Sequence, residues 1–189
     1  AAAELAGANV LGGIAPHAGW GFSGPLALLT LEALARAANR PQTLIVFATS
    51  HNPAVRQPAL QVRGRWGVPT GELEIDEELA AAMLQESDPA CLAENPEGHN
   101  GDHAIEVLLP LIQETLPGTR FVPVAMPHGP FGPEAGRAAA QAIRRTGRAA
   151  LALASTDLTH YGADYYGWAP KGAGPAAHRW AKEINDREF

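Results

Sequence analysis

The sequence predicts an α/β fold, with a mostly parallel central sheet flanked by helices in a single domain spanning residues 1–189. Four apolar runs, at residues 10–15, 43–48, 120–126 and 149–154, have the length of buried strands. Stretches with helical spacing of apolar residues separate several of them. The chain of 189 residues is long enough to bury a core, and its single cysteine, Cys91, excludes a disulfide within the chain.

The first two strands are joined by a helix. We expect it to begin at Ser23, a good N-cap, with Pro25 in its first turn, and to continue over residues 26–37. Asn39-Arg40-Pro41 ends this helix before the second strand. Two apolar strands joined by a helix predict a right-handed βαβ unit with parallel strands.

Residues 59–75 alternate in polarity and are interrupted by Gly and Pro, which predicts a small antiparallel excursion from the sheet. Asp76 is expected to cap a helix that runs to Gln85. A further helix begins at His103 and is kinked or restarted at Pro110. Gly147 closes an alanine-rich helix at residues 134–145, and a last helix is expected at residues 176–186.

Composition excludes several classes of partner. The formal net charge is −6 and the basic residues are scattered, which is unlike a nucleic-acid-binding protein. No segment approaches the ~20 apolar residues of a membrane span, and the start lacks the basic region of a signal peptide. With one cysteine, a cytoplasmic location is expected.

Histidines recur where the predicted strands end. His17 and His51 follow the first and second strands, and Asp157 and His160 follow the fourth. Because the carboxyl ends of parallel strands meet at one edge of a sheet, these side chains are expected to share a crevice. A single loop histidine is more often a residue that bonds to the turn backbone, so it is the recurrence that favours a site.

His103 and Glu106 are three residues apart at a helix start, which places them on one helical face. This spacing is equally typical of a ligand paired with a base and of a solvated first turn. His128 also follows a strand, but Gly and Pro beside it make a turn role at least as plausible.

Two or three imidazoles with a carboxylate suit a divalent transition metal such as Fe(II), Zn(II) or Cu(II). Two histidines and one anionic ligand are the pattern of non-haem Fe(II) oxygenases. The rings of Trp20, Phe22 and Tyr161 would wall an aromatic or amphipathic small-molecule substrate. No serine-hydrolase elbow, Walker A sequence or dinucleotide-binding glycine motif is present.

Four ordered segments carry a resemblance to a known family: Pro16-His17-Ala18-Gly19-Trp20 with Phe22-Ser23-Gly24, Ser50-His51, His103-Ala104-Ile105-Glu106-Val107-Leu108-Leu109-Pro110, and Ser155-Thr156-Asp157-Leu158-Thr159-His160-Tyr161-Gly162. Together they resemble the Memo family, also called AmmeMemoRadiSam system protein B, whose fold is similar to class III extradiol ring-cleaving dioxygenases.

The resemblance implies that His17 and His51 are metal ligands. It further implies that His160, as third ligand or general acid/base, lines the same pocket as Asp157, with His103 and Glu106 as further groups of the catalytic pocket. The implied function is a dioxygenase-like oxidoreductase that uses Fe(II), with Cu or Zn as other candidate metals, on a small molecule. The alternative is a non-catalytic adaptor that binds a peptide or phosphopeptide in the same crevice.

The chain departs from the family pattern at both ends and at Asn52, where the family often has a second histidine. The usual N-terminal lead-in and the late Cys-Gly segment, which often supplies a cysteine ligand, are missing from the sequence. We therefore expect a chain that is incomplete at its C-terminus, or a short relative that completes its metal site with His160, Asp157, Glu106 or water. A homo-oligomer or a complementing chain is the corresponding protein partner.

Overall fold

The computed structural model describes residues 7–188, with the backbone alone for Tyr165 and Glu188. It contains two compact units, divided between Thr156 and Asp157, and each is described by itself. The first unit holds the sheet and the second holds two helices. The expectation of a single domain stays a prediction.

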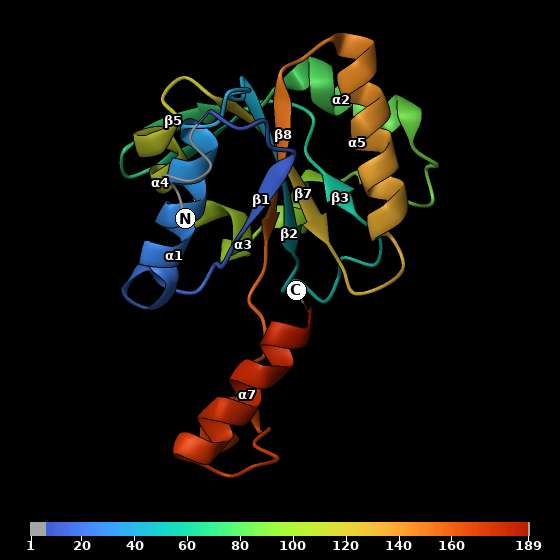
Figure 1. Cartoon of the computed structure of the whole chain (residues 1–189). Coiled ribbons are helices and arrows are strands. Elements are labelled where there is room, and N and C mark those ends of the chain that lie inside the picture. The colour runs from blue at the N-terminus through green and yellow to red at the C-terminus, as the bar shows by residue number, and fades with distance from the viewer. Residues whose placement is uncertain (1–6, 189) are drawn as a thin grey trace. The chain divides into compact units, whose positions relative to one another are not determined.

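The first unit is built around a six-stranded sheet with the order β1-β8-β2-β7-β3-β6 (Figure 1). β1, β8, β2 and β7 run parallel to one another, whereas β3 is antiparallel to β7. The predicted mostly parallel sheet is confirmed. The bounds of its strands are β1 (Gly12–Ala15), β2 (Thr43–Thr49), β3 (Ala59–Leu60), β6 (Ala93–Glu94), β7 (Arg120–Met126) and β8 (Ala150–Ser155).

Helices flank this sheet. α2 (Glu77–Glu86) packs against α5 (Gly132–Thr146), and α1 (Trp20–Ala35) packs against α4 (Leu109–Thr115) on the other side of the sheet (Figure 1). Two shorter helices, η1 (Pro96–His99) and α3 (His103–Glu106), precede α4. β4 (Arg65–Val68) and β5 (Gly71–Glu74) form a separate antiparallel pair, which confirms the predicted excursion.

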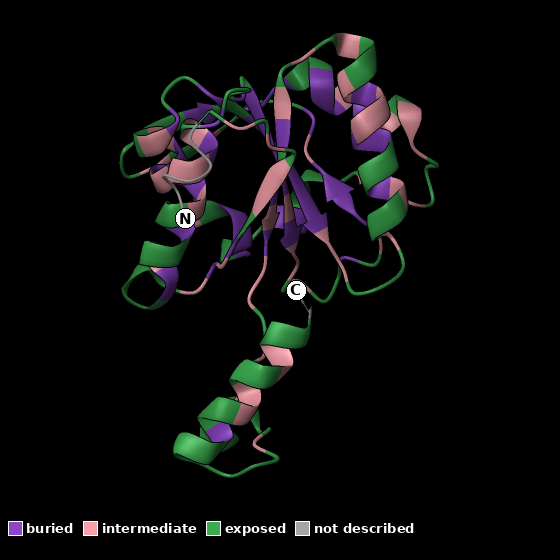
Figure 2. Ribbon diagram, viewed as in Figure 1, coloured by how far each residue is buried: buried purple, intermediate pink, exposed green. Residues whose placement is uncertain are grey.

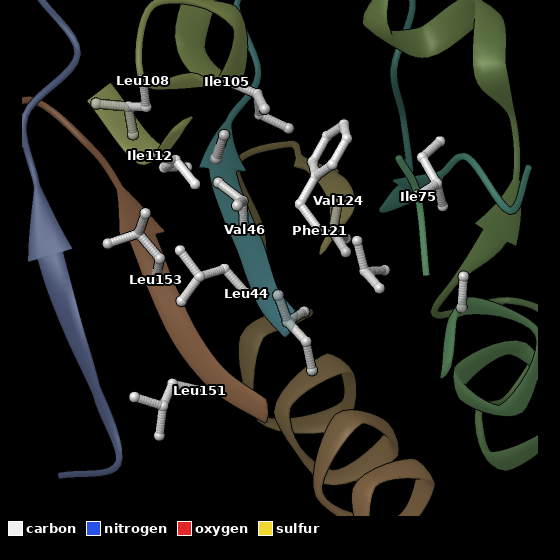
Figure 3. Packing of buried hydrophobic residues seen from close by; sticks show 14 of the residues in the cluster. Leu44, Val46, Ile75, Ile105, Leu108, Ile112, Phe121, Val124, Leu151 and Leu153 are labelled. Carbon is white, nitrogen blue, oxygen red and sulfur yellow. The ribbon is translucent and has the colours of Figure 1, made fainter. Parts of the chain in front are cut away.

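The core of this unit lies between the sheet and its helices. Leu44 and Val46 of β2 stand in register with Leu151 and Leu153 of β8, and all four point to one side of the sheet. Figure 3 shows them beside the apolar side chains of α3 and α4 and the segment between them. Buried residues are concentrated on the central strands, while the outer faces of the helices are exposed (Figure 2). Both faces of β2 are thus largely covered, as is typical of a parallel sheet.

Several predicted helix ends are confirmed. The carboxylate of Asp76 caps α2 by accepting from the Leu79 N–H, and it also accepts the Thr43 hydroxyl at 2.5 Å. The chain restarts at Pro110 in the first turn of α4, and Gly147 ends α5 in the left-handed region with φ of 65°. Because a new helix starts at Leu109, α3 ends at Glu106 and is a single turn long.

The predicted start of α1 is wrong. The helix begins at Trp20 with Gly19 as its N-cap, and Pro25 lies inside it. Ser23 lies inside the helix and so does not cap it, and its hydroxyl donates to the Ala18 carbonyl oxygen at 2.9 Å. The earlier start brings α1 directly after His17.

The second unit contains α6 (Ala163–Tyr166) and α7 (Pro175–Glu188). Asn185 of α7 accepts hydrogen bonds from the backbone N–H and the hydroxyl of Thr159. The rings of Tyr161, Trp168 and Trp180 lie within 6.0 Å of one another, measured between centroids. These contacts tie the loop after β8 to the last helix. Within the described residues, no helix has the length and apolar character needed to cross a bilayer.

Candidate metal centre

Three histidine rings converge at the carboxyl edge of the sheet. His17 lies two residues beyond β1, His51 two residues beyond β2, and His103 begins α3. Their centroids are 5.1 Å apart for His17 and His51, 5.8 Å for His17 and His103, and 4.8 Å for His51 and His103. β1 and β2 both pair in parallel with β8, so their ends emerge at the same edge. The predicted convergence of His17 and His51 is therefore observed.

The orientation of His17 is set by Ser155, the last residue of β8. His17 is 1% exposed, and its Nδ1 lies 2.9 Å from Ser155 Oγ. The Ser155 hydroxyl donates its one hydrogen to the Ala104 carbonyl oxygen at 2.5 Å. Its oxygen must therefore accept from His17, which places the imidazole proton on Nδ1. The lone pair that can bind a metal is then on Nε2.

The orientation of His51 is set by Asp102, the N-cap residue of α3. Nδ1 of His51 lies 3.1 Å from Oδ1 of Asp102, and the His51 backbone N–H donates to Oδ2 at 2.7 Å. The carboxylate also accepts the Ala104 N–H at 3.0 Å and the Ser50 hydroxyl at 3.2 Å. Nδ1 of His51 is thus the protonated nitrogen, and Nε2 carries its lone pair.

The charge of Asp102 follows from the same contacts. Burial by itself would raise the pKa of this carboxyl. The bonds from the Ala104 N–H and from His51 outweigh that effect and hold the pKa below its usual range. Asp102 is therefore an ionised acceptor at neutral pH.

The cluster of His51, Asp102 and His103 could hold a metal ion, since one potential ligand atom from each lies within 4.8 Å of the others. Each carboxylate oxygen of Asp102 already accepts two hydrogen bonds, however. This favours a role for Asp102 in orienting His51, with ligation by the imidazoles. A histidine held by a carboxylate is a common arrangement in metal sites. Neutral imidazoles suit Zn, Cu and Fe, so the residues present fit a divalent transition metal.

Of the remaining candidate residues, Glu106 and His128 belong to the first unit, and Asp157 and His160 belong to the second. Glu106 is exposed on α3 and is not among the residues of the cluster. Asp157 and His160 belong to the second unit, where the His160 ring lies edge-on to Tyr166 with centroids 5.0 Å apart. Their contribution to the centre stays a prediction, because the two units are described separately. His128 is exposed in the loop after β7.

The aromatic wall predicted from Trp20, Phe22 and Tyr161 also stays a prediction. The Trp20 indole N–H donates to the Val107 carbonyl oxygen at 2.8 Å, which attaches the start of α1 to the end of α3. Phe22 is 89% exposed. Tyr161 lies in the second unit, where its hydroxyl donates to the Gly172 carbonyl oxygen.

Two orienting residues escaped the sequence analysis. Ser155 was quoted only as part of a segment that resembles the family, because its place at the end of a strand between those of His17 and His51 depends on strand order. Asp102 had a local signal, because an Asp directly before a predicted helix start is a strong N-cap. That the same carboxylate would reach His51, 51 residues away, had no local signal.

Most of the chain is similar to members of one protein family. Residues 5–188 match a family model described as Memo-like protein. A MEMO1 family protein of Methanothermobacter thermautotrophicus is 40% identical over 155 residues, which cover 81% of this chain and 55% of that protein. A MEMO1 family protein of Methanopyrus kandleri is 35% identical over 79% of this chain and 53% of its own length. A MEMO1 family protein of Pyrococcus abyssi is 35% identical over 86% of this chain and 56% of its own length. The chain spans about half the length of these relatives.

Proposed function

The chain belongs to the Memo-like protein family, and on that premise we propose that it binds one divalent transition metal through His17, His51 and His103. The observation that carries the proposal is that a neighbouring side chain hydrogen-bonds to Nδ1 of each of two imidazoles. Ser155 engages Nδ1 of His17 and Asp102 engages Nδ1 of His51, so Nε2 is the ligating nitrogen in both.

We further propose that the metal is Fe(II), or else Cu, and that the protein is a dioxygenase-like oxidoreductase acting on a small molecule. A bound Fe(II) or Cu ion would supply redox chemistry toward dioxygen, and a Zn ion would supply Lewis-acid chemistry. The chain's own part is to hold neutral imidazoles in position, with their protons directed at Ser155 and Asp102. His160 and Asp157 keep their proposed roles, His160 as a further ligand or acid/base group and Asp157 beside it.

Metal loading tests this function. The protein is incubated anaerobically with Fe(II), Cu or Zn, desalted and assayed for bound metal. We expect about one ion per chain, and stoichiometric binding is lost in His17→Ala, His51→Ala and His103→Ala. His178→Ala is the matched control, because His178 is exposed on α7. The proposal would be wrong if the protein bound no stoichiometric metal, or if the three variants bound as much metal as the control.

The oxidoreductase assignment needs its own measurement. We expect the Fe(II)-loaded protein to consume dioxygen when catechols or other phenols are added, and the His51→Ala variant not to do so. His160→Ala then separates its two roles: loss of turnover with retained metal indicates an acid/base group, whereas loss of both indicates a ligand.

The adaptor alternative draws support from the exposure of His51, whose side chain is 40% accessible and lines an open groove. A peptide could bind in such a groove without being chemically changed. Phosphopeptide binding that survives His51→Ala, together with no dioxygen uptake by the metal-loaded protein, would favour the adaptor over the enzyme.

A further inference from the structure

A groove lies beside the candidate metal centre, between the loops that follow β2 and β7. It has a volume of about 680 Å³ and includes His51 in its lining. The roots of the two loops are held together by the Ser50 N–H, which donates to the Met126 carbonyl oxygen at 2.8 Å. Its volume is in the range of roughly 300–1,000 Å³ that small-molecule sites have. The groove also lies at the carboxyl ends of parallel strands, where α/β folds bind ligands.

The groove has an apolar wall. Pro53 and Val55 line it from the loop after β2, and Phe131 lines it from the loop after β7. Val55 is 5% exposed and is anchored in a small buried cluster with Ala59 and Ala125. This side therefore has a fixed surface against which an apolar body can pack.

The charge of the groove is opposite to that of the chain. None of the described residues that line it is acidic, whereas Arg56 stands on its rim with an exposed side chain. Within the described part of the chain, Arg56 has no carboxylate partner among the ion pairs, unlike Arg65, Arg137 and Arg148. In a protein with a formal net charge of −6, this is a local positive site next to the candidate metal centre.

We propose that this groove binds a small organic acid with an apolar body. Its carboxylate pairs with the planar guanidinium of Arg56, which matches a carboxylate in two parallel hydrogen bonds. The apolar body lies against Phe131 and Val55, and its other end reaches His51. The inference rests on the proposed function, because the groove would present the bound molecule to the metal held at His51.

A monoanionic carboxylate is favoured over a phosphate by the count of donors. Arg56 is the one permanently charged side chain among the described lining residues, and the other basic groups there are the imidazoles of His51 and His128. Phosphate sites generally gather several N–H donors or cations around the dianion.

The test compares three probes with one ring: phenylacetate, its neutral counterpart phenylacetamide, and phenyl phosphate. Their dissociation constants are measured by NMR titration with the metal-free and the Zn-loaded protein. We expect phenylacetate to bind about tenfold more tightly than phenylacetamide. The preference should disappear in Arg56→Gln. It should persist in Arg63→Gln, a matched change of an exposed arginine that does not line the groove.

The outcomes separate this inference from the proposed function. A charge preference in the metal-free protein that depends on Arg56 supports the carboxylate site even if metal loading fails. Equal binding of phenylacetate and phenylacetamide, loss of the preference in Arg63→Gln, or no binding of any probe would overturn it. Tighter Arg56-dependent binding of phenyl phosphate would also overturn it and point to a phosphorylated ligand.

Discussion

Asp102 and Ser155 decide which nitrogen of His51 and of His17 is offered to a metal. Each residue has a second task that holds it in place. Asp102 caps α3 through the Ala104 N–H, and Ser155 donates to the Ala104 carbonyl oxygen. Both orienting contacts therefore depend on the backbone at Ala104. The start of α3 and the end of β8 form one support under the imidazoles.

Asp102→Asn should weaken metal binding without disturbing the helix. Asn is as good an N-cap as Asp, but its NH2 group replaces one of the two accepting oxygens. The bond from the backbone N–H or from the Nδ1–H of His51 is then lost, and the neutral amide accepts the remaining one less strongly. We expect the metal affinity to fall by about 10- to 100-fold, as for other residues that support a ligand. Competition with a chromogenic chelator measures this. Asp88→Asn, a change in an exposed loop, is the control, and equal affinities for the two variants would contradict the orienting role.

His99 should make the protein less stable in mild acid. Burial lowers its pKa from 6.5 to about 4, although Asp102 and the Ala59 backbone oppose that effect. The unfolded chain therefore takes up a proton that the folded chain refuses. The contribution of neutral His99 to the free energy of unfolding is fully present above pH 6.5. It is lost as the pH falls from 6.5 toward about 4, which lowers the free energy of unfolding by roughly 2–3 kcal/mol.

Urea unfolding at pH 7 and pH 4.5 checks this effect. The loss of unfolding free energy between the two pH values should shrink in His99→Gln and remain in His178→Gln, since His178 is exposed. If His99→Gln loses as much stability between the two pH values as the parent protein, His99 is not the responsible group.

At the scale of elements, β1 is placed by two glycines. A Cβ on Gly12 would lie 2.1 Å from the Ala152 carbonyl oxygen of β8, and one on Gly13 would lie 2.6 Å from Cγ2 of Thr30 on α1. The strand is thus enclosed between its neighbour and its own helix. Because His17 follows β1 by two residues, the close approach at Gly12 also positions a candidate ligand.

Gly12→Ala should therefore affect both stability and metal binding. We expect a loss of about 1–3 kcal/mol in the free energy of unfolding, as for other overpacked sites. We also expect a weaker metal affinity, since β1 must move away from β8. Urea unfolding and chelator competition measure the two effects.

Gly21→Ala is the control for this change. No heavy atom lies within 4 Å of a Cβ built there, and the residue is inside α1. An alanine in a helix should leave the stability unchanged or raise it by up to about 1 kcal/mol. A Gly12→Ala protein as stable as this control would show that β1 tolerates a side chain at that position.

At the scale of the whole molecule, the candidate ligands come from segments far apart in the chain. His17, His51 and His103 are brought together only when β1, β2 and α3 are in place. A metal that binds all three therefore binds the folded state more tightly than the unfolded chain. Binding energy becomes folding stability.

Metal should consequently raise the melting temperature, and chelation should reverse the rise. At a free metal concentration about 100 times the dissociation constant, the gain is about 2.7 kcal/mol. Scanning calorimetry with Zn and then with EDTA measures it. The His51→Ala variant should respond little. An equal shift in that variant would mean that the metal acts elsewhere on the chain.

The sequence by itself determined the strands, most helix ends and the placing of histidines at strand ends. These features depend on local physics: apolar runs in β2 and β7, a cap at Asp76, a left-handed glycine at Gly147. Membership of the family was also readable from four short segments. Such signals can be read from the sequence because each depends on residues close together in the chain.

Only the tertiary structure decided which imidazoles meet and what holds them. β8 lies between β1 and β2, and that strand order is what brings Ser155 to His17. His103 joins His17 and His51 because α3 reaches the same edge, where Asp102 also contacts His51. The physical reason is that these contacts join residues 51 and 138 positions apart, and no local periodicity or spacing specifies them.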